Sequence, residues 1–238
     1  MKNHINEIIA IDGPAGSGKS SLTKKLADDL GLFHIDSGAF YRTCAYILTS
    51  LHGLSLEQIK SDDKNIQKLN IHSISYKPGP DVLMLIDQKI VDRDIRKPEI
   101  SQLASQISQI AWIRNWVNLQ LRNLVSLRNG ISVMEGRDIG TVIFPYSKCK
   151  FFLTASIEVR ARRRLKELEE MSSSLQSLAQ LDLSYEKIFE EIKKRDHADE
   201  NRPIAPLKKA DDAIEVDTSN KSFEEVLVFL KEQILRIF

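Results

Sequence analysis

Cysteine is scarce in this sequence, which has two among its 238 residues, Cys44 and Cys149. They lie far apart and form no C-x-x-C pair, so neither a disulfide framework nor a cysteine-based zinc site is expected. Long apolar runs are also missing, and none approaches the roughly 18 residues of a membrane-spanning helix. The first residues lack the apolar centre of a signal peptide. These absences predict a protein of the reducing cytoplasm without a membrane partner.

A charge excess of either sign is absent too. The 34 lysine and arginine residues nearly balance the 33 aspartate and glutamate residues, which leaves a formal net charge of +1. Nucleic-acid-binding proteins usually carry a clear basic excess, so no nucleic acid partner is expected. The five histidines show no H-x-x-x-H spacing, and scattered histidines are more often structural residues than metal ligands. The hydrophobic fraction of 42% is that of a globular protein, which excludes the disordered and fibrous classes.

Short apolar runs alternate along the chain with longer segments that have apolar residues at helical spacing. The runs predict buried strands at residues 8–11, 32–35, 131–135, 150–154 and 213–217. The other segments predict helices over residues 19–30, 39–51, 97–127 and 157–195, and a last helix that follows Ser222. This alternation predicts an α/β fold in which a parallel sheet has helices on both faces.

Residues 61–97 interrupt this pattern. Residues 70–76 alternate between apolar and polar side chains, and residues 82–86 form a second strand beyond the turn at residues 77–81. Two such strands joined by a turn are typical of an antiparallel hairpin. We therefore predict a small antiparallel insertion here rather than a further strand–helix unit.

One segment has the pattern of a phosphate-binding loop. After the first strand, the sequence matches G-x-x-x-x-G-K-S/T over Gly13, Pro14, Ala15, Gly16, Ser17, Gly18, Lys19 and Ser20. In such a loop the backbone N–H groups and the positive end of the following helix face the phosphates. Lys19 would reach the β- and γ-phosphates, and the Ser20 hydroxyl would ligate Mg²⁺. Because the loop lies between a strand and a helix, as the motif requires, it predicts binding of a nucleoside triphosphate.

Other residues indicate which class of triphosphate-binding protein this is. The N-K-x-D motif of GTPases is absent, and the sequence shows no obvious Walker B strand of the h-h-h-h-D type. Arginines are frequent instead, and phosphoryl transfer needs cations around the moving group. Arg137 is the strongest candidate, because it follows a glycine at the carboxyl end of a predicted strand, where ligands of open α/β sheets bind. The other candidates are Arg42, Arg114, Arg160, Arg163, Arg164, Arg195 and Arg202.

Several motifs together resemble the bacterial cytidylate kinase family. They are the phosphate-binding loop, D-S-G-A-F-Y-R at residues 36–42, I-R-K-P-E-I-S at 95–101, E-G-R-D-I-G-T at 135–141, L-T-A-S at 153–156, the arginine-rich run 160–164 and D-T-S at 217–219. They follow the family's order over essentially the whole chain. The resemblance implies a P-loop NTPase-type five-stranded parallel sheet with helices on both faces, a small mixed NMP-binding insertion and a helical lid.

The resemblance also implies a domain organisation and a reaction. Residues 1–238 would form a single nucleoside monophosphate kinase domain. Its parts would be a core of residues 1–60, 128–156 and 204–238, an NMP-binding insertion of about 61–127, and a lid of about 157–203. The expected reaction is Mg²⁺-dependent transfer of the γ-phosphoryl group of ATP to CMP or dCMP, by a monomer.

By the same resemblance, each substrate has its own set of residues. The ATP site would combine residues 13–20 with Ser21, Arg160 and Arg164. The residues expected to bind CMP are Asp36, Ser37, Arg42, Ser105, Arg114, Arg137, Asp138, Asp199 and Arg202. Those expected to be catalytic are Lys19, Arg137 and Arg195. Asp138 would read the base, because its carboxylate accepts the cytosine N4 amino group but would face a carbonyl oxygen of uracil.

Other interpretations compete at several of these positions. Arg160 to Arg164 lie in a segment of mixed charge, so a salt-bridged helix exposed to solvent is an alternative for each of them. Trp112 and Trp116 are four residues apart, and packing is favoured over stacking on a base. Asp87 and Gln88 stand where the family commonly has an Asn-Gly turn, so a differently shaped hairpin is expected.

The function has competitors as well. One is a P-loop kinase for another small acceptor, such as UMP or a metabolite hydroxyl. Another is a non-catalytic ATP-dependent switch or a nucleic-acid-binding ATPase. The net charge of +1 and the missing base-stacking pattern disfavour this second class.

Overall fold

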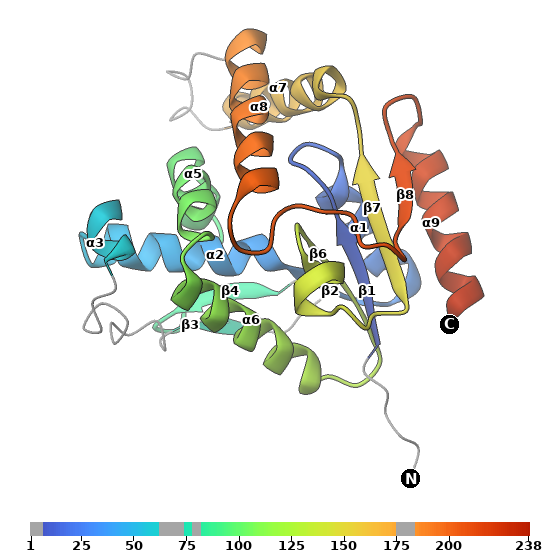
Figure 1. Cartoon of the computed structure of the whole chain (residues 1–238), viewed down its shortest axis with the longest axis horizontal. Helices are drawn as coiled ribbons and strands as arrows, with labels where there is room; N and C mark the ends of the chain where they lie inside the picture. Colours follow the sequence, from blue (N-terminus) through green and yellow to red (C-terminus); the bar gives the residue numbers. More distant parts are fainter. Residues whose placement is uncertain (1–6, 62–73, 78–81, 175–183) are drawn as a thin grey trace.

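A parallel β-sheet forms the centre of the computed structural model, which describes residues 7–61, 74–77, 82–174 and 184–238. The five predicted strands are all present, and each pairs with its neighbours in parallel. In spatial order they are β2 (Phe33–Asp36), β6 (Ile131–Gly136), β1 (Glu7–Asp12), β7 (Cys149–Thr154) and β8 (Ile214–Asp217) (Figure 1). Because β1 is the middle strand, the loop that follows it lies at the centre of the carboxyl edge of the sheet.

Helices cover both faces of this sheet, as predicted. They are α1 (Lys19–Leu30), α2 (Ser37–Tyr46), α6 (Ala111–Ser126) and α9 (Phe223–Ile237). Ile9 and Ile11 of β1 belong to the hydrophobic core that contains α1 and α9, whereas Ile8 and Ala10 belong to the core that contains α2 and α6. All four side chains are buried, which explains why this strand is apolar at successive positions.

A second, antiparallel sheet stands where the insertion was predicted. Its strands are β3 (Ile74–Lys77), β4 (Leu83–Ile86) and β5 (Lys89–Ile90). Residues 70–73 of the predicted first strand lie outside the described residues, and β5 was not predicted. In the two-residue turn between β4 and β5, φ is +48° at Asp87 and +65° at Gln88. Positive φ at both positions is the geometry of an Asn-Gly type I′ turn, so the expected change in shape is not found.

The single helix predicted over residues 97–127 is wrong, because the structure has two helices there. They are α5 (Pro98–Ile107) and α6. Ile110 between them is extended, with φ of −86° and ψ of 120°. The side chain of Arg114 donates from Nε to the carbonyl oxygen of Ser108 at 3.1 Å. No proline or glycine marks this break in the sequence, so helical spacing alone could not locate it.

Short helical segments complete this half of the molecule. The predicted helix over residues 39–51 is confirmed in extent, but its last part is a π-helical turn, η1 (Ile47–Leu51). The other short elements are α3 (Leu56–Lys60), the 3₁₀ turn η3 (Asp94–Arg96) and the π-helical turn η4 (Ile139–Ile143).

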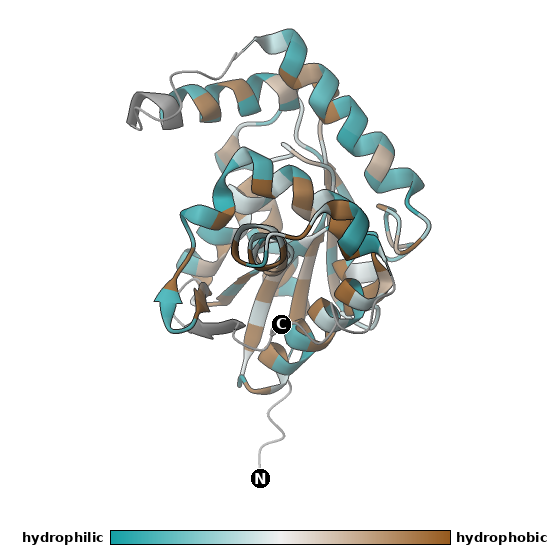
Figure 2. Ribbon diagram, turned by 90° about the vertical axis from the view of Figure 1, so that its left-hand side faces the viewer, coloured by the Kyte–Doolittle hydropathy of each residue, from teal (hydrophilic) through white to brown (hydrophobic). Residues whose placement is uncertain are grey.

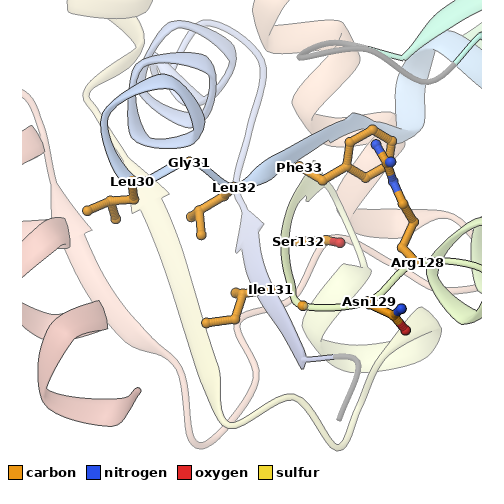
Figure 3. Close-up of a pocket in the computed structure, with 9 residues that line it drawn as sticks. Leu30, Gly31, Leu32, Phe33, Arg128, Asn129, Ile131 and Ser132 are labelled. Atoms are coloured by element: carbon orange, nitrogen blue, oxygen red, sulfur yellow. The ribbon is translucent and has the colours of Figure 1, made fainter. Parts of the chain in front are cut away.

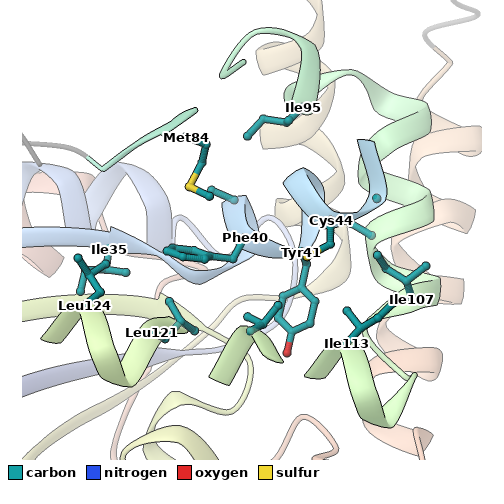
Figure 4. Close-up of a cluster of buried hydrophobic side chains, with 14 of the residues drawn as sticks. Ile35, Phe40, Tyr41, Cys44, Met84, Ile95, Ile107, Ile113, Leu121 and Leu124 are labelled. Atoms are coloured by element: carbon teal, nitrogen blue, oxygen red, sulfur yellow. The ribbon is translucent and has the colours of Figure 1, made fainter. Parts of the chain in front are cut away.

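Buried side chains from these elements form one hydrophobic cluster with the sheet. Figure 4 shows Ile35 of β2, Phe40 of α2 and Met84 of β4, which all belong to it. Trp112 and Trp116 pack against the same cluster and are partly buried, so the packing interpretation is confirmed for both. The cluster holds α2 and α6 against the sheet, and these helices carry Arg42 and Arg114.

Two further helices lie beyond the carboxyl edge of the sheet. They are α7 (Ile157–Ser174) and α8 (Tyr185–Asn201), and Ala161, Ile188 and Ile192 form a small core between them. Most residues of these two helices are hydrophilic (Figure 2). The helical prediction for residues 157–195 is confirmed on both sides of residues 175–183, which lie outside the described part. Within the described residues, no helix has the length and apolar character needed to cross a membrane.

Candidate active site

The phosphate-binding loop joins the carboxyl end of β1 to α1. Gly18, the last residue before α1, has a φ of +86°, which side-chain-bearing residues rarely adopt. A Cβ atom on Gly13 would lie 2.1 Å from the carbonyl oxygen of Leu153, so only glycine fits where the loop passes β7. Ser17 Oγ donates to the carbonyl oxygen of Pro14 at 3.1 Å and closes the loop. A loop of this form in front of a helix N-terminus is suited to bind an anion.

Lys19 lies within this loop rather than on its surface. Its side chain is buried, and Nζ donates to the carbonyl oxygen of Pro14 at 2.5 Å and to Ser17 Oγ at 3.2 Å. Burial, and then the nearby Arg137, lower the pKa of Lys19 well below the ordinary lysine value. A phosphate group in the loop would favour the charged ammonium form, because opposite charges stabilise each other in a buried site.

A carboxylate lies beside the loop where the sequence analysis found none. Ser20 Oγ donates to Glu135 Oε2 at 2.5 Å, and His34 Nε2 lies 3.1 Å from Glu135 Oε1. Ser37 Oγ donates to the carbonyl oxygen of the same glutamate at 2.7 Å. Glu135 is buried near the carboxyl end of β6, where a Walker B acid is expected. The strand does not match h-h-h-h-D, because Ser132 interrupts the apolar run and the acid is glutamate.

Ser20 and Glu135 together offer two oxygen ligands for a metal ion. Mg²⁺ prefers oxygen ligands and is usually held by one or two carboxylates, with substrate phosphates and water completing its shell. In the described ranges no group of three or more His, Cys, Asp or Glu side chains is arranged to hold a metal ion. The pair therefore fits the protein's share of a Mg²⁺ site, with Glu135 added to the predicted Ser20.

Asp36 and Arg42 are joined across the first turns of α2. Asp36 Oδ1 accepts the N–H of Ala39 at 3.2 Å and caps the helix, while Oδ2 accepts Arg42 Nη2 at 2.6 Å. Burial alone would raise the pKa of Asp36, but Arg42 and Arg96 outweigh it and lower the pKa to about 2. Arg42 Nε is buried and has no hydrogen-bond partner among the described residues. This guanidinium therefore keeps a donor for an anionic ligand.

Arg137 extends from the carboxyl edge of the sheet toward α8. Its Nε donates to Asp199 Oδ2 at 2.9 Å. Burial alone would raise the pKa of Asp199, but Arg137 and Arg195 lower it below the ordinary value. Arg195 is exposed and makes no hydrogen bond or ion pair with any residue in the described part of the chain. The charges of Arg137 and Arg195 both lower the pKa of Lys19, so the two arginines lie within electrostatic reach of the loop.

Arg114, Asp138 and Arg202 form a buried group of charges. Arg114 Nη1 donates to Asp138 Oδ2 at 2.6 Å, and Arg202 Nη2 donates to Asp138 Oδ1 at 3.4 Å. All three residues are at least 94% buried, with exposed fractions of 2%, 4% and 6%. Arg114 Nη2 is buried but unpartnered within the described ranges. The group thus contains a carboxylate acceptor next to a free guanidinium donor, the two chemical features that cytosine recognition needs.

Tyr41 borders this charged group, although the sequence analysis assigned it no role. The guanidinium carbon of Arg114 lies 5.6 Å from the centroid of its ring. Its hydroxyl group is buried and has no partner in the described structure. The predicted Ser105 lies half-buried on α5, where its carbonyl oxygen accepts the hydroxyl of Ser108 at 2.8 Å. A ligand with polar edges would satisfy unpaired atoms of this kind.

The arginines of α7 differ from one another. Arg160 is buried, and it donates to the carbonyl oxygens of Ala155 at 2.9 Å and Ala15 at 3.1 Å and pairs with Asp196 at 2.6 Å. The alternative of a solvent-exposed salt bridge is therefore wrong for Arg160. Arg164 instead pairs with Glu167 at 2.7 Å on the surface, as that alternative describes.

One residue expected at the ATP site does not lie with the charged groups of the candidate site. Ser21 is exposed in the first turn of α1.

A pocket lined by Phe33, Arg128 and Ser132 lies at the amino-terminal ends of β2 and β6, away from the candidate site (Figure 3). Arg128 stacks on the ring of Phe33 there, 3.4 Å from its centroid. Ligands of open α/β sheets bind at the opposite, carboxyl edge, where the charged groups described above converge.

Comparison with known proteins identifies the family of this chain. The sequence profile of the family described as "Cytidylate kinase" matches residues 9–236. A cytidylate kinase of Thermosipho melanesiensis is 41% identical over 96% of this chain and 95% of its own length. The cytidylate kinase of Fervidobacterium nodosum is 42% identical over 92% of each chain. That of Caldanaerobacter subterraneus is 42% identical over 95% of this chain and 93% of its own length. The chain therefore belongs to the cytidylate kinase family.

Proposed function

We propose that this chain transfers the γ-phosphoryl group of ATP to CMP or dCMP and releases ADP with CDP or dCDP. The observation that carries the proposal is the buried group of Arg114, Asp138 and Arg202, which lies at the same sheet edge as the phosphate-binding loop. A triphosphate site alone fits many enzymes. A buried carboxylate beside an unpartnered guanidinium donor favours one kind of nucleoside monophosphate as the substrate that receives the phosphoryl group. Its base must carry an amino group next to atoms that accept hydrogen bonds.

The proposed base recognition uses this group directly. Asp138 accepts the N4 amino group of cytosine, and Arg114 donates from Nη2 to the ring acceptors. Uracil would present a carbonyl oxygen to the Asp138 carboxylate, which leaves two acceptors facing each other in a buried site. Such mismatches give strong discrimination, so CMP is favoured over UMP. Ser105 and Arg202 complete this side of the acceptor site in the proposal.

In this proposal the 5′-phosphate of CMP lies at the end of its site that faces ATP. Arg42, Arg137 and Arg195 hold it, with Asp199 orienting Arg137 through the 2.9 Å contact. The second pKa of a phosphate monoester is about 6, so the attacking oxygen is already ionised at neutral pH and needs no general base. The chain therefore acts by positioning the reactants in line and by placing Lys19 and these arginines around the transferred group.

The donor side is assigned by the same reasoning. The loop from Gly13 to Ser20 holds the phosphates of ATP, and Arg160 braces it through the carbonyl oxygen of Ala15. When bound, Mg²⁺ neutralises charge on the β- and γ-phosphates, and Ser20 and Glu135 are the residues that would hold it. Arg164 lies farther along α7 and would approach ATP when the lid closes.

The domain organisation belongs to this proposal as well. Residues 1–60, 128–156 and 204–238 act as the core, residues 61–127 as the insertion that binds the monophosphate, and residues 157–203 as a lid. Closure of the lid would exclude water and so prevent hydrolysis of ATP. We further propose that the protein acts as a monomer in the cytoplasm, a compartment compatible with its two buried free cysteines.

A coupled assay of ADP release tests the proposal. The purified chain is given ATP and Mg²⁺ with CMP, dCMP, UMP, AMP or GMP in turn, and with DNA or RNA in place of a monophosphate. We expect fast turnover with CMP or dCMP, and none without an acceptor. Faster turnover with UMP would favour the competing kinase, whereas ATP hydrolysis stimulated by DNA or RNA would contradict phosphoryl transfer to a monophosphate.

A further inference from the structure

Asp12 is a buried carboxylate to which neither the sequence analysis nor the proposed reaction assigns a role. It is the last residue of β1 and directly precedes the phosphate-binding loop. Its side chain contacts a distant part of the chain, where Oδ1 accepts the N–H of Ile139 at 2.9 Å and Oδ2 accepts the N–H of Gly140 at 2.7 Å. The residue is 4% exposed. One carboxylate therefore joins the donor loop to the segment that begins at Asp138.

The two amides are the first of η4, the π-helical turn that starts directly after Asp138. The first N–H groups of a helical turn have no acceptor within the turn and need one from elsewhere. Asp138 itself has φ of −146° and ψ of 26° and offers no capping hydrogen bond from its side chain. Its carboxylate is directed to Arg114 and Arg202 instead. Asp12 therefore caps the turn, and the carboxylate of Asp138 can bind these arginines instead of capping it.

The fit around this contact is close. A Cβ atom on Gly140 would lie 3.4 Å from Asp12 Oδ2 and 3.1 Å from Lys150 Cδ, so the backbone approaches the carboxylate with little spare room. The Lys150 ammonium does not pair with Asp12, since it donates to the carbonyl oxygen of Pro145 and to Asp212. Asp12 has no ion pair among the described residues, and a buried carboxylate held only by backbone amides is costly. Such costs are commonly found at functional sites.

We propose that Asp12 is a positioning residue that holds the turn of residues 138–143 against the phosphate-binding loop and so keeps the base-reading Asp138 in place relative to the donor. This rests on the proposed function, because it assumes that Asp138 reads the acceptor base. The two oxygens act as a pair, with one for each amide. A side chain with a single acceptor oxygen therefore cannot replace the carboxylate.

The test uses Asp12→Asn in the full-length protein. Asparagine keeps the size but turns one acceptor into an amino group that faces a backbone N–H. We expect the KM for CMP to rise by about tenfold or more, because small misplacements of substrate-binding groups cost one to two orders of magnitude. The KM for ATP should change less than about twofold. A larger effect of Asp12→Ala, which removes both acceptors, would agree with the paired action of the oxygens.

Ser147→Ala is the matched control. Ser147 is also buried and donates to the carbonyl oxygen of Ile8 at 2.5 Å, near the other end of β1. This variant loses a buried hydrogen bond of the same strand, but it should leave the KM for CMP unchanged. Equal effects of both variants on the KM for CMP would overturn the positioning role. An equal rise of the two KM values in Asp12→Asn would also overturn it, because Asp12 would then only shape the loop.

A second measurement does not depend on the reaction. Amide hydrogen exchange of the peptide that covers residues 137–143, recorded without substrate, should accelerate in Asp12→Asn and not in Ser147→Ala. Unchanged exchange would overturn the contact itself, and faster exchange with an unchanged KM for CMP would overturn its positioning role. If the wild-type chain did not phosphorylate CMP, the proposed function would fail and Asp12 would lose its assigned role, whereas the exchange data would still report whether the turn is held.

Discussion

The donor and acceptor sides of this molecule are built in different ways. The donor side is a continuous loop of residues 13–20, held together by short-range contacts within itself. The acceptor side consists of charged side chains from α2, α6, α8 and the end of β6, far apart in the sequence. Apart from Arg195, these charges are paired with one another in the described structure, as Arg114 is with Asp138. A contiguous site can therefore be found from a local pattern, whereas a site of distant charge pairs depends on the whole fold.

The difference also predicts how substitutions act. A residue of the donor loop contacts mainly neighbours in the loop, so its loss should affect turnover more than stability. Most charged residues of the acceptor side belong to a buried or partly buried ion pair, so their loss should affect both turnover and stability, because the remaining charge is left without a partner. Variants of Lys19, Arg137 and Asp138 test this contrast.

Lys19→Ala should have the largest effect on turnover. Removal of a cation aimed at the transferred phosphoryl group should lower kcat by about 10³-fold. Because burial and Arg137 lower the pKa of Lys19, the folded protein disfavours its charge, which offsets the loss of its hydrogen bond to Pro14, and the melting temperature should fall less than in Arg137→Ala. Steady-state kinetics and a thermal melt measure the two effects. Lys25→Ala, which removes an exposed lysine paired with Asp29, is the control.

Arg137→Ala should have the second-largest effect on turnover. It removes a guanidinium from the acceptor phosphate and leaves Asp199 without its 2.9 Å partner. We expect kcat/KM for CMP to fall by about 10²-fold or more and the melting temperature to fall as well. Arg128→Ala, at the opposite edge of the sheet, should leave kcat/KM unchanged. Near-normal turnover of Arg137→Ala would contradict its place at the acceptor phosphate.

Asp138→Asn should alter the choice of base. Its new amino group can face the carbonyl oxygen of uracil, so the ratio of kcat/KM for CMP to that for UMP should fall by roughly thirtyfold, or about 2 kcal/mol. The same change weakens a buried ion pair with Arg114, so the free energy of unfolding should fall by about 3 kcal/mol. Asp211→Asn, an exposed aspartate, is the control. An unchanged ratio would remove Asp138 from base recognition.

The same contrast decides how much could be predicted from the sequence. The five strands and the phosphate-binding loop follow from local apolar runs and from one motif, and all are present. The break between α5 and α6 was missed because no proline or glycine marks it and the helical spacing continues across it. Glu135 was missed because a serine interrupts its strand, although an acid at that strand end was a signal that a looser pattern would have found.

The acceptor residues depended on the family resemblance rather than on spacing. Nothing local in the sequence connects Arg114 with Asp138 or Arg137 with Asp199, because the contacts form only when the helices pack on the sheet. The contact of Asp12 with Ile139 and Gly140 is of the same kind, since 127 residues separate the carboxylate from the first amide. Pairings of this sort cannot be read from one sequence, because many other partners would satisfy the same charges.

The smallest expected effect is on how the free energy of unfolding depends on pH. It concerns Asp12, which joins the donor loop to the turn that carries Asp138 on the acceptor side. Burial raises the pKa of Asp12 from 3.8 to about 6, against the opposing effects of its two amide partners, with Asp138 raising it further and Lys19 lowering it. A raised pKa means that folding disfavours the charged form. The contribution of Asp12 to the free energy of unfolding is therefore most favourable below pH 3.8 and is lost as the pH rises through 6.

Asp12→Asn does not titrate, so between pH 5 and 7.5 the wild type should lose about 1 kcal/mol of unfolding free energy relative to the variant. Urea unfolding of both proteins at the two pH values measures this difference. A wild type that instead gains stability relative to Asp12→Asn as the pH rises would show that the amides of Ile139 and Gly140 outweigh burial, and that the contact stabilises the fold at neutral pH.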